Sequence, residues 1–401
     1  MSMSIYEHFG VEPIINVAGT KTIYGGSTMS EKVAEAIKDA SRYSVHLYEV
    51  QAAASRLISK KTHAEAGLVT SGAYAALTLS AAACMCGLDV SKMNRLPDTT
   101  NVQNEFIMPW HQISGYDHSI RVAGGKIIPA GFPNHTSSPF EVVTITIDDI
   151  RVEINEKTAG ILYAPRYKSH PPLDKVITVA KEYSIPVILD AAAQIPPIDN
   201  LYRFIDMGAD LVCFSGGKGI RGPQSSGILC GKKDLISSAA LQMLDMAVES
   251  FPEWNPPSDL INKEKINGRP LHGIGRGGKV DKETIIGLLV ALEELDENQF
   301  KEKSLKLKAY LEKINVLIHN IKGVTTEMTE DYLGAYPMLM IKINEEELGM
   351  SAKEVTKKLK ENRIYPREYK IYKGEFYIHS LNMDEEIADF VGKKLLDVLK
   401  R

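Results

Sequence analysis

Short apolar runs that alternate with helix-like stretches constrain the fold of this chain more than any other feature. The runs are bounded by Gly, Pro or Asp, and several are continuously apolar, as strands buried on both faces of a sheet are. They are EFIMP near 107, GKIIPAG near 127, EVVTITI near 144, AGILYAP near 162, IPVILD near 188, ADLVCFS near 213 and SGILCG near 228. Helical patterns begin at Ser30, Leu47, Ser71 and Leu173. This order predicts an α/β domain with a mostly parallel sheet covered by helices.

The pattern changes in the last third of the chain. One long helical pattern begins at Asp281, and shorter strand-like and helix-like segments follow it. We therefore expect a large domain over residues 1–275, with an N-terminal arm over about 1–28. A linking helix over 276–320 and a small α+β domain over 321–401 are expected to follow.

Composition limits the class of protein. Of the 401 residues, 44% are hydrophobic and 24% are charged, which is typical of a globular protein. The net charge of −4 disfavours a general electrostatic grip on nucleic acid. No apolar run approaches the roughly 18–20 residues of a membrane helix, and residues 1–10 do not resemble a secretory signal. With only four cysteines, the cytoplasm is the expected location.

A lysine between glycines is the most informative local feature. Lys218 lies in FSGGKGIRGP, directly after the apolar run ADLVC. Glycines allow a backbone to approach a ligand closely, and a lysine there can form an imine with a carbonyl group. A phosphate-binding glycine loop, or a simple turn, is the alternative interpretation. The GxxxxGK[ST] pattern of a Walker loop is absent.

A carboxylate and an anion site accompany this lysine. Asp190 ends the run IPVILD, where ligands of open α/β sheets bind, and it can keep a pyridine nitrogen protonated. Thr70 and Ser71 precede Gly72 and Ala73 at the start of a small-residue helix, whose N–H groups and dipole favour a phosphate. Taken singly, Asp190 can also cap a helix or pair with a buried arginine, and the hydroxyls can form an ordinary N-cap. Together, the three features predict pyridoxal 5′-phosphate (PLP) as the cofactor.

The same stretches resemble the SelA-like family of PLP-dependent fold type I enzymes. This family includes bacterial selenocysteine synthase and D-glucosaminate-6-phosphate ammonia-lyases. The resemblance covers roughly residues 11–295, and its most specific parts are the lysine loop and the GRxxKVxKE stretch. The other matching stretches are INVAGT, EVQAAASRLI, EAGLVTSGAYAAL and ILDAAAQ. The resemblance implies a seven-stranded, mostly parallel sheet in the large domain.

The resemblance also implies roles for individual residues. Lys218 would carry the Schiff base with PLP, and Asp190 would face the pyridine nitrogen. The phosphate would be held by Ser71, Gly72 and Ala73, with Thr70 and Ser215 beside them. An imidazole often stacks on the ring in such enzymes. Here, His111 is the candidate and His118 the alternative, unless both are ordinary loop histidines.

Two basic residues occupy positions at which members of the family have basic side chains that bind an anionic part of the substrate or cofactor. Arg276 and Lys279 occupy these positions, although GIGRGGK taken alone indicates only an exposed basic turn. The synthases carry a second arginine where Lys279 stands, and a lysine is a point donor without the planar fork of an arginine. The synthases also have an extra N-terminal domain for transfer RNA. Because the resemblance begins about fifteen residues from Met1, we expect a small-molecule substrate and no nucleic acid partner.

These observations lead to one preferred function. We expect a PLP-dependent carbon–nitrogen lyase that eliminates water and ammonia from a β-hydroxy amino acid, such as D-glucosaminate or its 6-phosphate, to give a 2-oxo acid. A transferase, transaminase, racemase or aldolase of the same group is the alternative, and a non-catalytic PLP-binding regulator is a second. Fold type I sites usually form between subunits, so a homodimer or a larger even-numbered assembly is expected.

The cysteines do not predict a metal site. Cys84 and Cys86 lie on the Ala-rich helix, whereas Cys213 and Cys230 lie in strand-like runs. Zinc would need four ligands brought together, so we interpret these residues as small buried hydrophobic groups.

Overall fold

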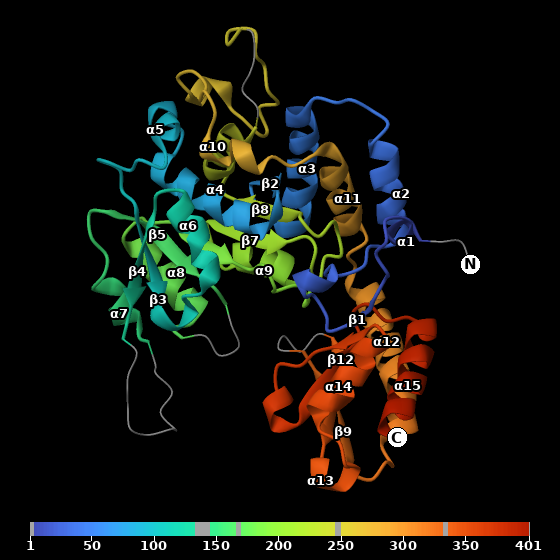
Figure 1. Ribbon diagram of the computed structural model, residues 1–401. Helices are drawn as coiled ribbons and strands as arrows, with labels where there is room; N and C mark the ends of the chain where they lie inside the picture. The colour runs from blue at the N-terminus through green and yellow to red at the C-terminus, as the bar shows by residue number, and fades with distance from the viewer. Residues whose placement is uncertain (1–3, 133–144, 166–169, 245–249, 332–335, 401) are drawn as a thin grey trace. The chain divides into compact units, whose positions relative to one another are not determined.

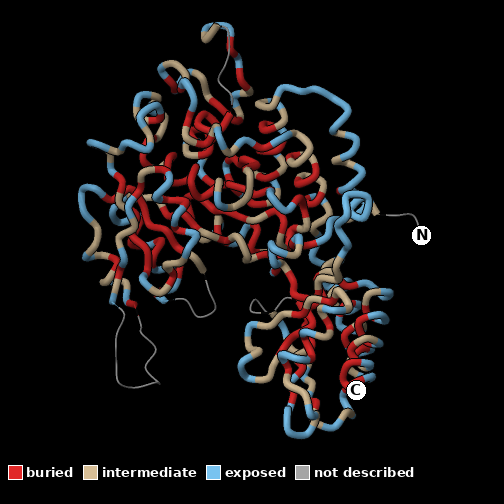
Figure 2. The backbone as a smooth tube through the Cα atoms, viewed as in Figure 1, coloured by how far each residue is buried: buried red, intermediate tan, exposed pale blue. Residues whose placement is uncertain are grey.

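A computed structural model describes residues 4–132, 145–165, 170–244, 250–331 and 336–400 (Figure 1). Its contacts divide the chain into two compact units. The larger unit comprises residues 29–294, and the smaller one combines residues 1–28 with residues 295–401. Buried residues are concentrated in the sheet of the larger unit and in the helices next to it (Figure 2). None of the described helices has both the length and the apolar run needed to cross a membrane.

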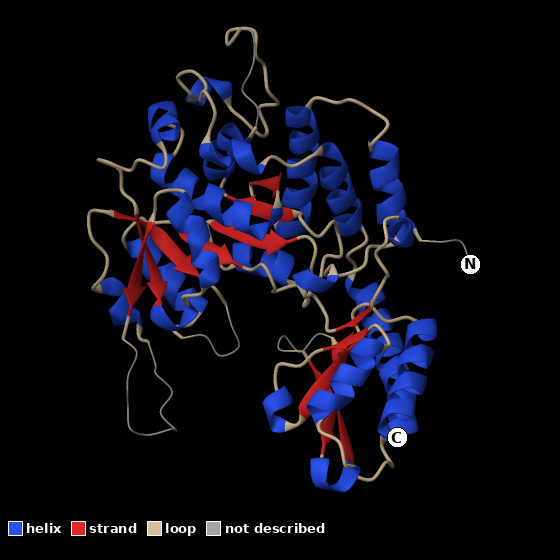
Figure 3. Cartoon of the chain, viewed as in Figure 1, coloured by secondary structure: helices blue, strands red, loops and turns tan. Residues whose placement is uncertain are grey.

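The larger unit is built around a seven-stranded sheet (Figure 3). The strand order is β2-β8-β7-β6-β5-β3-β4, and β8 runs antiparallel to both of its neighbours. Pairings among β7, β6, β5, β3 and β4 are parallel. The strands are β2 (Ala66–Thr70), β3 (Glu105–Pro109), β4 (Lys126–Ala130), β5 (Thr158–Tyr163), β6 (Val187–Asp190), β7 (Leu211–Ser215) and β8 (Gly227–Gly231). The predicted mostly parallel sheet of a fold type I enzyme is therefore confirmed.

Helices cover both faces of this sheet. On one face, α4 contacts β5 to β8, whereas α3 packs on β2 and β8 from the other side. Most residues of α4 are themselves buried, as its Ala-rich composition predicts. The helices are α2 (Glu31–Ala40), α3 (Leu47–Thr62), α4 (Gly72–Cys86), α5 (Val90–Arg95), α6 (His118–Val122), α7 (Ile147–Arg151), α8 (Leu173–Glu182), α9 (Asn200–Asp206), α10 (Lys233–Met243) and α11 (Lys282–Glu293).

The smaller unit has its own core. Strands β12, β10 and β9 form an antiparallel sheet in that order, and α12, α14 and α15 supply apolar residues to the same hydrophobic cluster. The elements are α1 (Ile5–His8), β1 (Ile15–Val17), α12 (Glu297–Ile318), β9 (Val324–Glu330), β10 (Pro337–Ile343), α13 (Glu345–Leu348), α14 (Ala352–Glu361), β11 (Ile364–Pro366), β12 (Glu375–His379) and α15 (Glu385–Leu399).

The N-terminal arm differs most from the sequence-based organisation. The sequence pattern places residues 1–28 in the large domain, but in the structure β1 pairs in parallel with β11 of the smaller unit. Asn16 stabilises the turn that follows, since its side-chain amide donates to the carbonyl oxygens of Gly19 and Gly26 at 3.0 and 3.1 Å. Such a pairing joins segments almost 350 residues apart, which no local pattern reveals.

The predicted linking helix is divided into two. The pattern from Asp281 to Ile318 forms α11 and α12, with a break at residues 294–296. Asp296 begins the second helix, because its carboxylate accepts hydrogen bonds from the backbone N–H groups of Asn298 and Gln299. The boundary between the two units falls in this break and not at residue 275. Of the predicted strands, EVVTITI lies mostly outside the described residues, and Thr146 within it caps α7.

Candidate active site

Strands β2, β6 and β7 end at one edge of the sheet, and each carries a predicted site residue there. Thr70 ends β2 and Ser215 ends β7, and both pair in register with Gly227 of β8. Asp190 ends β6 and pairs with Cys213 of β7. The register therefore brings the three predicted side chains to one edge of the sheet, where ligands of open α/β sheets bind.

Lys218 lies in a tight loop directly after β7. Backbone bonds close this loop, from Gly216 N–H to the Ser226 carbonyl (2.8 Å) and from Gly222 N–H to the Gly216 carbonyl (2.9 Å). A Cβ on Gly217 would lie 2.3 Å from Cα of Gln224, and one on Gly219 would lie 1.9 Å from the Ile195 carbonyl oxygen. These glycines are thus required for close packing against neighbouring backbone, and they hold Lys218 in a fixed position.

Two opposing effects act on the amine of Lys218. Burial lowers the pKa of Lys218, and the negative charge of Asp190 partly opposes this shift. The lowered pKa raises the fraction of neutral amine at a given pH, and the neutral amine is the form that attacks a carbonyl or removes a proton. The carboxylate of Asp190 and the amine of Lys218 therefore interact electrostatically.

The residues predicted to bind a phosphate lie at the N-terminus of α4, but the hydroxyl groups of Thr70 and Ser71 bond to backbone carbonyls. Thr70 donates to the Gly72 carbonyl (3.0 Å), and Ser71 donates to the Gly278 carbonyl (2.6 Å). Because the side chain of the N-cap residue Ser71 makes no capping hydrogen bond, the backbone N–H groups of the first turn, including those of Gly72 and Ala73, are the donors suited to a phosphate.

The histidine candidates occupy different environments. His111 lies in a short 3-10 helix that follows β3 directly, and it is half-buried. Gln112 next to it accepts a hydrogen bond from the Ala164 N–H (2.8 Å), which ties this segment to the end of β5. His118 begins α6 and is exposed. The structure therefore favours His111 as the histidine near the strand ends, and its stacking role stays a prediction.

The basic residues line a hollow near the N-terminus of α4. Arg276 and Lys279 share it with His272 and Gly277. The bond from Ser71 to the Gly278 carbonyl fixes this segment beside the predicted anion site. Sequence reasoning missed His272, although its position four residues before Arg276 in LHGIGRGGK was the available signal.

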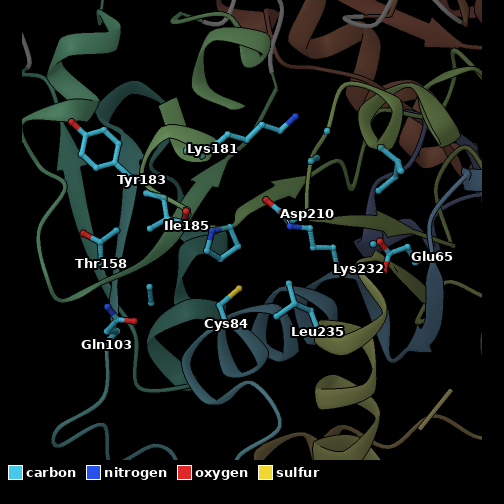
Figure 4. Close-up of a pocket in the computed structure, with 18 of the residues that line it drawn as sticks. Glu65, Cys84, Gln103, Thr158, Lys181, Tyr183, Ile185, Asp210, Lys232 and Leu235 are labelled. Carbon is cyan, nitrogen blue, oxygen red and sulfur yellow. Dashed lines mark ion pairs between the residues drawn. The ribbon is translucent and has the colours of Figure 1, made fainter. Parts of the chain in front are cut away.

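A second hollow lies at the opposite edge of the sheet (Figure 4). Thr158 at the start of β5 and Asp210 just before β7 line it, together with Cys84 of α4. An ion pair between Lys232 and Asp210 (2.5 Å) spans part of its wall. None of the predicted site residues lines this hollow, so it is separate from the candidate active site.

The residues at the strand ends fit PLP in their chemistry. A helix N-terminus suits its phosphate, the carboxylate of Asp190 suits a protonated pyridine nitrogen, and the amine of Lys218 suits its aldehyde. Fold and donor set together define a PLP-dependent enzyme of fold type I.

Comparison with known proteins agrees with this class. The Aminotransferase class-V family model matches residues 141–331. D-glucosaminate-6-phosphate ammonia lyase of Salmonella typhimurium (strain 14028s / SGSC 2262) is 28% identical, over 98% of this chain and 97% of the relative. The 5′-C-glycyluridine monooxygenase-decarboxylase of Streptomyces sp is 25% identical, over 98% of this chain and 92% of the relative.

Two further matches indicate which PLP-dependent enzymes of this fold the chain is similar to. The L-seryl-tRNA(Sec) selenium transferase of Mannheimia succiniciproducens is 26% identical, over 56% of this chain and 50% of the relative. A solved structure of D-glucosaminate-6-phosphate ammonia-lyase superposes with a TM-score of 0.81 at 26% identity, covering 100% of this chain and 99% of that chain. These matches fit a SelA-like family of PLP-dependent enzymes, and PLP is the cofactor of this chain.

Proposed function

We propose that the chain is a PLP-dependent ammonia-lyase that acts on a β-hydroxy amino acid, such as D-glucosaminate or its 6-phosphate, and releases a 2-oxo acid. The likeness to D-glucosaminate-6-phosphate ammonia lyase carries this proposal, because it extends over 98% of this chain and 97% of the relative. The fold likeness to the solved ammonia-lyase extends over the whole chain as well. The amine and carboxylate at the strand ends supply the acid–base groups that such a reaction requires.

In this proposal, Lys218 is the base that removes the proton at the substrate α-carbon. When bound, PLP supplies an electron sink for the carbanion that this step creates. Burial lowers the pKa of Lys218, which makes the neutral, proton-accepting amine more abundant. Lys218 would also hold the cofactor through its aldehyde group, which would keep the amine within close range of the substrate α-carbon.

The other site residues would bind and orient the cofactor and the substrate. Asp190 would hold a proton at the pyridine nitrogen, with the first-turn N–H groups of Gly72 and Ala73 on the phosphate and Ser215 beside Lys218. His111 would stack on the ring from the loop after β3. The side chains of Arg276 and Lys279 would bind an anionic group of the substrate in the basic hollow, with His272 beside them.

The net reaction removes one ammonia from the substrate. The β-hydroxyl and the α-proton leave as water, and the released enamine takes up one water as it hydrolyses to the 2-oxo acid and ammonia. The test is to incubate the PLP-loaded enzyme with D-glucosaminate and with its 6-phosphate, and to measure ammonia and oxo acid. Amino-group exchange with an added oxo acid, in the absence of net ammonia release, would instead favour the transaminase alternative.

A second candidate function is oxidative decarboxylation. It is favoured by the Streptomyces 5′-C-glycyluridine monooxygenase-decarboxylase, which matches this chain over nearly the same length as the ammonia lyase does. The two functions differ in products that are easily measured. A lyase releases ammonia without consuming oxygen, whereas the alternative consumes oxygen and releases carbon dioxide. If the protein is a racemase, an aldolase or a non-catalytic PLP-binding regulator, we expect neither ammonia release nor oxygen consumption with carbon dioxide release.

We also propose that the protein is a homodimer or a larger even-numbered assembly in the cytoplasm. The resemblance to fold type I enzymes supports the assembly, and four free cysteines are compatible with a reducing compartment. Light scattering on the PLP-loaded protein tests the assembly, and an active monomer would contradict it.

A further inference from the structure

Asp190 has a buried neighbour across the sheet that the proposed reaction does not use. Cys213 on β7 pairs in register with Asp190 on β6, so both side chains leave the same face of the sheet. Helix α4 covers that face, and the Sγ atom of Cys213 lies 3.4 Å from the Oγ atom of Ser80. Cys213 is fully buried. The side chain of Cys213 therefore lies beside that of Asp190 on the face of the sheet that α4 covers.

The direction of the hydrogen bond between Cys213 and Ser80 follows from the donors available. Ser80 has one hydroxyl proton and donates it to the Ala76 carbonyl at 2.8 Å. Its oxygen can then only accept from Cys213. The thiol proton consequently points to Ser80, away from Asp190, in a chain that runs from Cys213 through Ser80 to the Ala76 carbonyl.

We propose that Cys213 is a positioning residue that maintains the basicity of the Asp190 carboxylate toward the cofactor nitrogen. Cys213 fills the space beside Asp190 with a sulfur whose proton is directed to Ser80. A donor aimed at the carboxylate would compete with the pyridine nitrogen for the same charge. This inference rests on the position proposed above for Asp190 under the pyridine nitrogen.

Serine at position 213 would reverse this arrangement. A hydroxyl group needs a donor–acceptor distance of about 2.5–3.0 Å, and the shorter C–O bond would place its oxygen farther from Ser80 than the 3.4 Å of the sulfur. Asp190, the register partner of position 213, carries a carboxylate on the same face, and we expect the hydroxyl group to donate to it. Alanine at the same position leaves a gap but introduces no donor. The two substitutions thus separate hydrogen bonding from packing.

The experiment compares the affinity of the apoprotein for PLP and for the analogue in which a CH group replaces the pyridine nitrogen. Wild type should bind PLP more tightly than the analogue, because only PLP can share a proton with Asp190. In Cys213→Ser this preference should fall about tenfold, while Cys213→Ala should keep it. A purely structural role predicts the opposite order, since alanine removes more packing.

Two further variants complete the test. Cys230→Ser is the matched control, because Cys230 is also fully buried but pairs with Val212 and leaves the other face of the sheet. It should keep the preference. Ser80→Ala removes the acceptor of the thiol proton and should reduce the preference for PLP over the analogue, as Cys213→Ser does. It therefore keeps the proposal testable if Cys213→Ser does not fold.

The outcomes separate the two levels of inference. Equal preferences in Cys213→Ser and Cys213→Ala would overturn the role of Cys213, while leaving the position of Asp190 intact. A wild type that does not distinguish PLP from the analogue would instead contradict the proposed position of Asp190. Neither measurement depends on lyase activity.

Discussion

Gly227 of β8 lies against Gly72 at the start of α4, so close that a Cβ on Gly227 would be 2.4 Å from the carbonyl carbon of Gly72. Gly72 itself has a positive φ of 84°, which an L side chain rarely adopts. The backbone of β8 is therefore the support on which the predicted phosphate site rests. Its geometry depends on the absence of a side chain at position 227.

Gly227→Ala should displace this turn. Such overpacking typically costs about 1–3 kcal/mol, and we expect a loss of stability in that range together with at least about tenfold weaker PLP affinity. Gly115→Ala is the control, since no atom lies within 4 Å of a Cβ built there. Urea denaturation and PLP titration measure the two effects. Unchanged PLP affinity in a folded Gly227→Ala variant would show that the phosphate binds elsewhere.

Lys218→Ala should abolish the covalent bond to PLP and the proposed activity. Removal of a general base typically costs about 10²–10⁴-fold in rate, and loss of the amine also removes the bond to the aldehyde. Borohydride reduction followed by peptide mass analysis should label Lys218 in wild type and nothing at that position in the variant. Lys60→Ala, at an exposed position on α3, is the control for general lysine reactivity. Label that persists elsewhere in Lys218→Ala would identify another lysine as the PLP-bonding residue.

The pH dependence of PLP capture should follow the lowered pKa of Lys218. Only the neutral amine attacks the aldehyde, so the capture rate of the apoprotein should rise with pH, with a midpoint below that of an ordinary lysine. Asp190→Asn removes the negative charge that opposes the downward shift, so this midpoint should move to lower pH. Stopped-flow absorbance across a pH series measures both midpoints. An upward movement in Asp190→Asn would contradict the electrostatic effect that Asp190 is expected to have on Lys218.

Arg276→Ala and Lys279→Ala should distinguish the two proposed substrates. Both residues line the basic hollow next to the α4 N-terminus. If that hollow binds the substrate phosphate, each substitution should raise KM for D-glucosaminate 6-phosphate by about 10–100-fold, the value of a charge-assisted hydrogen bond. KM for unphosphorylated D-glucosaminate should change little. Steady-state kinetics with both compounds give the comparison, and an equal rise for both would place these residues on the shared carboxylate or on the cofactor.

Asn16→Ala should loosen the N-terminal arm. The amide of Asn16 donates to the Gly19 and Gly26 carbonyls, and its oxygen accepts from the Ala18 N–H at 3.0 Å. Loss of these partly buried bonds should destabilise the fold by about 1–3 kcal/mol and should make the segment before residue 28 more sensitive to proteases. Limited proteolysis read by mass spectrometry tests this. Cleavage at the wild-type rate would show that the β1–β11 pairing alone holds the arm.

Local pattern determined much of the fold in advance. Strand β7 and the lysine after it were predictable, because a continuous apolar run followed by glycines marks a buried strand that ends near a ligand. The same holds for Asp190 at the end of β6 and for the buried α4. The break between α11 and α12 was not predictable from the helical pattern, which continues through it. Asp296 could have indicated it as a capping residue.

What the sequence by itself determined is the class of chemistry: a lysine, a carboxylate and a small-residue helix start, each next to a predicted strand or helix end. These signals are local, because apolar runs and turn residues are read over a few positions. Only the tertiary structure decided that Thr70 and Ser215 pair with the same residue of β8, that Cys213 lies beside Asp190, and that residues 15–17 join the smaller unit. These relationships depend on strand order and register, which are set by packing between segments far apart in the chain.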